Sequence, residues 1–190
     1  YSLDLEPLDA TFRDSNRAPL HSWFPYLEGY SPRFVERVRH EYLGDAKRII
    51  EPFAGSGTTP IVLGQSGIEC AFAEANPAMA FIAETKLAVL RLNDKVRAKL
   101  VDDLVTLADT LKKRVPATVA DENLLAAYSN TFGSSKFFDE LALDEVLRLR
   151  TLNDELFSLD PLVGNCFSVA VLSSLIPTSR LKRAGDLRYR

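Results

Sequence analysis

The sequence is poor in several features that mark particular classes of protein. It has only two cysteines, Cys70 and Cys166, which stand alone without the spacing of a metal site. No secretory signal is visible, and the longest apolar tract, Phe167 to Ile176, is interrupted by serines and too short to cross a bilayer. These absences predict a reduced, cytoplasmic protein without a metal site or a membrane-spanning segment.

The sequence also lacks an excess of positive charge. The formal net charge is −3 over 190 residues, a length that suits one domain with a substantial core. An enzyme of nucleic acids would therefore have to rely on a local basic surface. The one dense basic segment is Arg180–Arg190, which could meet a DNA backbone or could equally be a solvated tail. We also expect the sequence to be cut at this point, because a natural end rarely follows so soon after a buried helix.

The most informative stretch is an apolar run that enters a turn of small residues and continues into a helical pattern. It reads Ile-Ile-Glu-Pro-Phe-Ala-Gly-Ser-Gly-Thr-Thr over residues 49–59. Glycines allow a sharp turn and the close approach of a ligand, and the N–H groups at the helix start then face that ligand. A phosphate-binding loop would need a lysine directly after Gly57, and a dinucleotide fingerprint would need glycine or alanine in place of Pro60. Neither fits.

A third pattern fits closely. Residues 51–59 resemble the Asp-Pro-Phe-x-Gly-Ser-Gly-Thr-Thr signature of DNA methyltransferases that modify exocyclic amino groups, and they depart from it only in Glu51, which keeps the carboxylate. The resemblance covers roughly residues 21–92. It implies an S-adenosyl-L-methionine (SAM) site in a Rossmann-like α/β fold.

The resemblance also implies which residues contact the cofactor. A carboxylate about twenty residues after the first glycine, at the end of the second strand, suits the ribose hydroxyls. In a parallel sheet it would lie beside the turn, and Glu74-Ala75-Asn76-Pro77 resembles the family's second motif. Within an aromatic segment, residues 21–34, Tyr26 could wall the pocket or could simply pack the N-terminal arm onto the core. The predicted cofactor-binding residues are Tyr26, Glu51, Pro52, Phe53, Ala54, Gly55, Ser56, Gly57, Thr58, Thr59, Glu74, Ala75 and Asn76.

The pattern of the remaining chain predicts three parts. Residues 1–20 form an extended arm, residues 21–92 an α/β half domain, and residues 93–190 an all-helical extension or insertion. In the half domain we expect a helix from Pro32 to Gly44, strands over 47–53 and 68–73, and helices over 58–65 and 77–92. In the extension we expect helices over 93–114, 121–128, 137–157 and 161–177, with Pro116 ending the first and a connecting loop over 129–135. The expected fold is therefore α/β, Rossmann-like and incomplete.

One part of the family pattern is missing. The amino methyltransferases carry an Asp/Asn/Ser-Pro-Pro-aromatic motif that binds the target amino group and stacks on the flipped base. The sequence has no Pro-Pro pair, and neither cysteine follows a proline, which argues against cytosine-C5 chemistry. No catalytic residue is therefore assigned. We expect DNA as substrate and a missing C-terminal half or companion chain that carries the motif. The alternatives are an RNA amino-methyltransferase, or a non-catalytic SAM-binding subunit or remnant.

Overall fold

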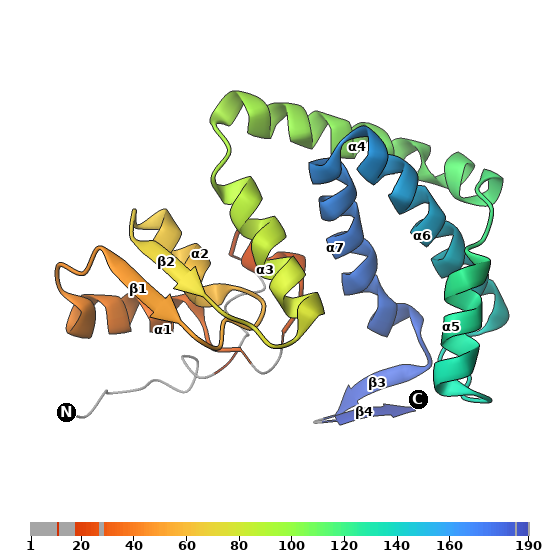
Figure 1. The fold of residues 1–190 in the computed structure, drawn as a ribbon, viewed down its shortest axis with the longest axis horizontal. Helices are drawn as coiled ribbons and strands as arrows, with labels where there is room; N and C mark the ends of the chain where they lie inside the picture. Colours follow the sequence, from red (N-terminus) through yellow and green to blue (C-terminus); the bar gives the residue numbers. More distant parts are fainter. Residues whose placement is uncertain (1–10, 12–17, 27–28, 185, 190) are drawn as a thin grey trace. The chain divides into compact units, whose positions relative to one another are not determined.

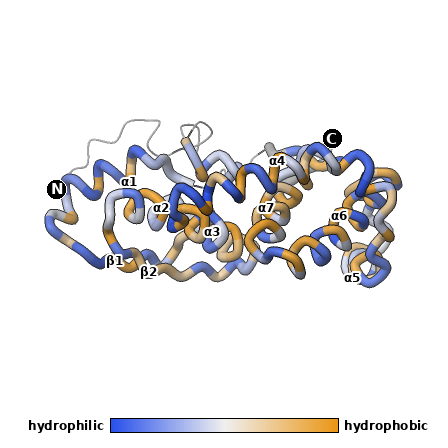
Figure 2. The backbone as a smooth tube through the Cα atoms, turned by 90° about the horizontal axis from the view of Figure 1, so that it is seen from above, coloured by the Kyte–Doolittle hydropathy of each residue, from blue (hydrophilic) through white to orange (hydrophobic). Residues whose placement is uncertain are grey.

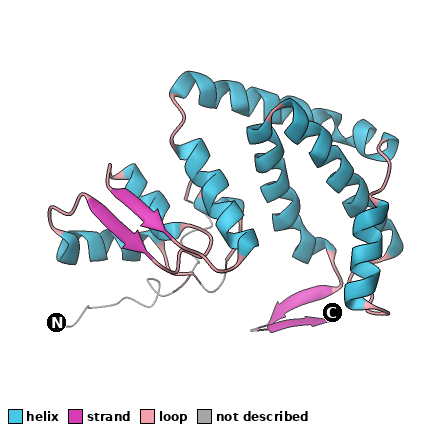
Figure 3. Ribbon diagram, in the orientation of Figure 1, coloured by secondary structure: helices cyan, strands magenta, loops and turns pink. Residues whose placement is uncertain are grey.

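The computed structural model describes residues 11, 18–26, 29–184 and 186–189, with side chains described as far as Lys182. The predicted arm over residues 1–20 therefore lies largely outside the described part. The chain divides into two compact units, Tyr1–Asn93 and Asp94–Arg190, which are treated separately below. The fold mixes many helices with a small parallel sheet (Figures 1 and 3).

The first unit contains the parallel sheet. Strands β1 (Arg48–Glu51) and β2 (Glu69–Phe72) pair in register from Arg48 opposite Glu69 to Glu51 opposite Phe72. Helix α2 (Thr58–Gln65) connects the two strands. The other elements described in this unit are a short 3-10 helix (His21–Trp23), α1 (Pro32–Val38), a π-helical turn (Arg39–Leu43) and α3 (Pro77–Leu90).

The helix starts of this unit follow from local sequence. Ser31 Oγ accepts a hydrogen bond from Phe34 N at the start of α1. Asn76 Oδ1 accepts from the N–H groups of Ala78 and Met79 at the start of α3. In both helices a proline follows the capping residue, where its missing N–H costs nothing. The predicted starts at Pro32 and Pro77 are confirmed, because both depend on capping signals in the local sequence.

Among the residues that the structure describes, helices cover one face of the sheet. Ile49 and Cys70 pack on a cluster formed by Val35 of α1 and by Val62 and Leu63 of α2. Each such buried aliphatic side chain stabilises the fold by about 1.5–3 kcal/mol. On the opposite face Arg48 pairs with Glu69 in an exposed ion pair, and Ile50 is 78% exposed.

The second unit is built from four helices and a hairpin. The helices are α4 (Asp94–Ala117), α5 (Glu122–Phe132), α6 (Glu140–Leu159) and α7 (Pro161–Thr178). Hydrophobic and hydrophilic residues alternate along α4, which is amphipathic (Figure 2). Strands β3 (Leu181–Ala184) and β4 (Asp186–Tyr189) pair antiparallel.

Helices α6 and α7 form the closest pair of this unit. Asp160 ends α6 and caps α7, accepting hydrogen bonds from the N–H groups of Leu162 and Val163. A Cβ on Gly164 would lie only 2.7 Å from the Cα of Phe157. The two helices therefore approach each other to backbone distance at this glycine.

Helix α7 is also longer than its apolar tract indicated. Its 18 residues have a mean hydropathy of 1.4, and 28% of them are buried. By length and composition it is the one helix among the described residues that could cross a membrane. Core helices of water-soluble proteins share these properties, so the absence of a membrane segment stays a prediction.

Three expectations for the second unit are corrected. Helix α4 continues through Pro116 to Ala117, and Arg148 donates hydrogen bonds to the last carbonyls at Pro116 and Thr118. The stretch 129–135, which was expected to be a loop, begins as the last turn of α5. The Tyr128 hydroxyl donates a hydrogen bond to Ser135 O and accepts one from Phe137 N, and these bonds fix the bend that follows at Gly133. The unit is not all-helical, because the basic stretch after Arg180 forms the β3–β4 hairpin. The described residues therefore form four strands rather than two.

Candidate site at the ends of the parallel strands

The carboxyl ends of β1 and β2 lie side by side and continue into two adjacent turns. Backbone pairing extends past the strands, since Ala73 N donates to Glu51 O at 2.9 Å and Ala54 N donates to Ala73 O at 3.1 Å. Open parallel sheets bind ligands at this edge, beyond the carboxyl ends of their strands. The two stretches that the sequence singles out, residues 51–59 and 74–76, are thus adjacent in space.

The carboxylate of Glu74 joins the two turns. Its Oε2 accepts a hydrogen bond from Gly55 N at 2.7 Å, and its Oε1 accepts from Asn76 N at 2.8 Å. Hydrogen bonds to an ionised carboxylate are among the stronger ones in proteins. A carboxylate offers about four lone-pair sites, so further acceptor capacity remains on a side chain that is only partly buried.

The two glycines of the turn have different neighbours. Gly55 has a φ of +53°, and a Cβ there would lie 2.9 Å from Tyr26 Cε1, so the tyrosine ring covers this position. Gly57 has a φ of +94°, and a Cβ there would meet Ala83 Cβ at 2.9 Å and Ala83 Cα at 3.1 Å. Gly55 is therefore required by the close approach of Tyr26, whereas Gly57 is required by the packing of α3.

Glu51 has a supporting position at the end of β1. Its Oε1 accepts from Phe53 N at 2.9 Å, and its Oε2 accepts from the Tyr30 hydroxyl at 3.1 Å. Tyr30 also forms a short hydrogen bond with the Thr59 hydroxyl at the start of α2. Burial, with the neighbouring Glu51 charge, raises the pKa of Tyr30 to about 12, so the phenol keeps its proton. This network ties the aromatic segment to both ends of the turn.

A buried lysine contacts the turn from α3. Lys86 Nζ donates a hydrogen bond to Ser56 O at 3.1 Å, and only 1% of the residue is exposed. Burial lowers the pKa of Lys86 to about 8. His21 lies near it, 3% exposed, and its Nε2 has no hydrogen-bond partner among the described residues. Burial and the Lys86 charge lower the pKa of His21 to about 4, so this imidazole is neutral at pH 7.

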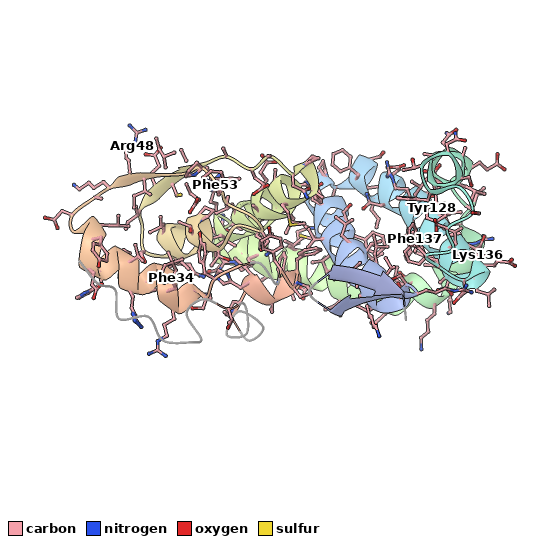
Figure 4. All side chains as sticks on the ribbon, turned by 90° about the horizontal axis from the view of Figure 1, so that it is seen from below. Phe34, Arg48, Phe53, Tyr128, Lys136 and Phe137 are labelled. Carbon is pink, nitrogen blue, oxygen red and sulfur yellow. The ribbon has the colours of Figure 1, made fainter. Side chains whose placement is uncertain are left out.

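The predicted site residues differ in how accessible they are. Phe53, just beyond the end of β1, is 83% exposed (Figure 4). The next residue, Ala54, is buried. Asn76 uses its side-chain oxygen to cap α3, so that oxygen serves the helix. The buried residues are Ala54, Gly55, Ser56, Gly57 and Thr58, the partly buried ones are Tyr26, Glu51, Thr59 and Glu74, and the exposed ones are Pro52, Phe53, Ala75 and Asn76.

Sequence reasoning missed Lys86 and Tyr30 as members of this site. Lys86 lies on the face of α3 that also carries Met79, Ala83 and Leu90, spaced by three or four residues. The sequence signal that could have pointed to Lys86 was its single charge within this apolar stripe. Within the part of the chain that is described, no group of histidine, cysteine and acidic side chains could hold a metal ion.

Comparisons with known proteins match one part of the chain. Over 82 residues, 43% of the chain, the sequence is 30% identical to the Type II methyltransferase M.AvaI of Nostoc sp. (strain PCC 7120) and to M.AvaI of Anabaena variabilis. It is 27% identical over 84 residues to the Type II methyltransferase M.BsoBI of Geobacillus stearothermophilus. The chain spans only 16–17% of the length of these relatives. No protein-family model and no solved structure matches it. Part of the chain is therefore similar in sequence to Type II methyltransferases.

Proposed function

We propose that this chain is the cofactor-binding half of a SAM-dependent DNA methyltransferase of the amino type, acting on adenine N6 or cytosine N4. The observation that carries the proposal is the turn over residues 51–59 with the Glu74 carboxylate hydrogen-bonded to Gly55. The similarity to Type II methyltransferases supports the reaction class. In this proposal the sheet is one part of a Rossmann-like sheet, and the protein acts in the cytoplasm.

The residues present fit such a cofactor. Glu74 would accept hydrogen bonds from the ribose hydroxyls with its unused lone pairs. Tyr26 covers the turn at Gly55 and would form one wall of the pocket. The N–H groups of Thr58 and Thr59 lie in the first turn of α2, where no side chain caps them. SAM supplies an electrophilic methyl group, and the described residues would bind and orient it.

Isothermal titration calorimetry with SAM and S-adenosylhomocysteine tests the proposal on the full chain. We expect binding by the wild type and a loss of roughly ten- to a hundredfold in Glu74→Ala, because the charge-assisted hydrogen bonds that this variant removes are worth about 1.5–3 kcal/mol. Glu69→Ala is the matched control, since Glu69 lies at the other end of β2 in an exposed pair with Arg48. Equal affinities in all three proteins would refute the role of Glu74. No binding by the wild type would refute the proposed function.

A second candidate is a non-catalytic SAM-binding subunit. It is favoured by the absence of a Pro-Pro-aromatic motif from these 190 residues. A companion chain that carries the motif would separate an enzyme half from a binder. Parallel methyl-transfer assays on DNA and RNA would separate the proposed activity from that of an RNA amino-methyltransferase.

A further inference from the structure

Lys86 is an unusual residue to find inside the first unit. Lysine is almost never fully buried without an ionic partner, because a buried charge loses its hydration. Yet Lys86 is only 1% exposed, and in the described part of the chain its ammonium donates a hydrogen bond to the carbonyl oxygen of Ser56. One carbonyl leaves two of the three ammonium protons without an acceptor among the described residues.

The surroundings of Lys86 do not neutralise its charge. Helix α2, which packs on α3, carries no ionisable side chain over Thr58–Gln65. His21, in the segment before α1, is neutral at pH 7, because burial and the neighbouring Lys86 charge lower its pKa to about 4. Across the described residues, no carboxylate lies within ion-pair distance of Lys86 Nζ. The Lys86 ammonium, bound to Ser56 O, therefore lies directly against the turn over residues 55–57, which also holds the Glu74 carboxylate at Gly55 N.

We propose that Lys86 is a positioning residue of the cofactor turn, and that its charge selects ligands that carry a carboxylate there. This inference rests on the proposed function and assigns the preference for an amino-acid-bearing nucleoside to one side chain. Through Ser56 O the ammonium fixes the direction of the peptide that precedes Gly57. Its charge adds to the positive end of the α2 dipole, and both favour an anionic group at the turn.

The inference also explains why the apolar stripe of α3 contains a lysine, whose buried charge lowers the stability of the fold. If Lys86 only filled space, Met would fill a similar volume without burying a charge. If Lys86 instead serves the turn, the Lys86→Met variant should resist denaturant at least as well as the wild type while binding the carboxylate ligand less well. A side chain that lowers stability and serves binding gives this combination of effects.

The test compares two ligands that differ only in the carboxylate, S-adenosylhomocysteine and its decarboxylated analogue S-adenosyl-3-thiopropylamine. Calorimetry on the full chain should show at least a tenfold loss of S-adenosylhomocysteine affinity in Lys86→Met. Affinity for the decarboxylated amine should be unchanged or improved, because the variant removes a like charge. Lys86→Gln, which keeps a hydrogen-bond donor without the charge, should behave in the same way. Lys47→Met, which removes an exposed lysine of the same unit, should leave both affinities within twofold of the wild type.

The outcomes separate this inference from the proposed function. A loss confined to the carboxylate ligand in both Lys86 variants supports the inference. Equal losses for the two ligands would mean that Lys86 only shapes the turn, and wild-type selectivity in Lys86→Gln would mean that its charge is irrelevant. Either result overturns the inference while the proposed function stands. If the wild type binds neither ligand, the proposed function fails, and this inference fails with it.

Discussion

At the scale of single residues, Gly57 shows how the structure changes the meaning of a substitution. From the motif alone, a side chain at Gly57 is expected to block the ligand and leave the sheet formed. That expectation is wrong in its cause, because a Cβ at Gly57 would meet Ala83 of α3 at 2.9 Å. A loss of binding in Gly57→Val would therefore report damage to α2–α3 packing rather than contact with the ligand.

We predict that Gly57→Ala destabilises the first unit more than Gly67→Ala does. Both glycines have positive φ, +94° and +75°, but a Cβ on Gly67 would meet nothing within 4 Å. Gly67→Ala should cost about 1–2 kcal/mol of conformational strain, and Gly57→Ala about 1–3 kcal/mol more from overpacking. Urea unfolding followed by the fluorescence of Trp23, the sole tryptophan, measures both. Equal losses would contradict the contact with Ala83.

His21 predicts an acid sensitivity of the first unit. Its pKa is about 4 in the folded chain and 6.5 in the unfolded one, so the unfolded state binds the extra proton. The free energy of unfolding should therefore fall as the pH drops from 6.5 toward 4, by at most about 3 kcal/mol. His21→Phe should remove this dependence, and the drop measured by Trp23 fluorescence should become smaller. His40→Gln, which removes the exposed second histidine, is the control, and an unchanged pH profile in His21→Phe would refute the assignment.

At the scale of elements, the two helical glycines Gly64 and Gly164 predict opposite effects. Replacing glycine by alanine inside a helix usually gains about 1 kcal/mol. At Gly64 of α2 the nearest atom to an added Cβ is the flexible end of Leu90, at 3.1 Å, so Gly64→Ala should be neutral or stabilising.

At Gly164 of α7 an added Cβ would meet the backbone of Phe157 at 2.7 Å and force α6 and α7 apart. Gly164→Ala should cost about 1–3 kcal/mol. Amide hydrogen exchange, read separately in α2 and in α6–α7, checks both variants. Faster exchange in α2 of Gly64→Ala, or unchanged exchange in Gly164→Ala, would show that the packing of the helices is not as described.

The elements that could be predicted from sequence are those with local start and stop signals. Helix α2 was predicted at its observed bounds because Gly57 precedes it and Ser66-Gly67 follows it. The elements that were missed depend on distant partners. Arg148 supports the end of α4 beyond Pro116, and Tyr128 fixes a loop through Ser135 and Phe137. No sequence pattern near Pro116 indicates that the guanidinium of Arg148, 32 residues later, will donate a hydrogen bond to its carbonyl.

The same division applies to the site. Glu74 could be placed beside Gly55 because parallel strands end at one edge, and the hydrogen bond between them shows that proximity. The binding roles of these residues stay predictions. Lys86 and the Glu51–Tyr30–Thr59 network could not be placed, since they join residues about 20 to 30 positions apart through side chains.

At the scale of the whole molecule, the parallel sheet of the first unit is small in the part of the chain that the structure describes. Its two strands have one packed face, and the other face exposes Ile50 and leads to the exposed Phe53. Parallel sheets are normally buried on both faces and contain more strands than two. The matched relatives are about six times as long as the part that the chain spans. We therefore propose that strands and helices from a further segment or a companion chain complete this sheet.

This proposal predicts that the chain alone binds SAM but transfers no methyl group. Nothing in its sequence supplies the Pro-Pro-aromatic motif that would accept hydrogen bonds from a target amine and stack on a flipped base. The measurement is tritiated-methyl incorporation into mixed-sequence DNA, first with the 190-residue chain and then with a segment or companion that carries the motif added. We expect incorporation only in the second case, and loss of that incorporation with Glu74→Ala. Clear incorporation by the chain alone would overturn the prediction, and the catalytic groups would then have to lie within these residues.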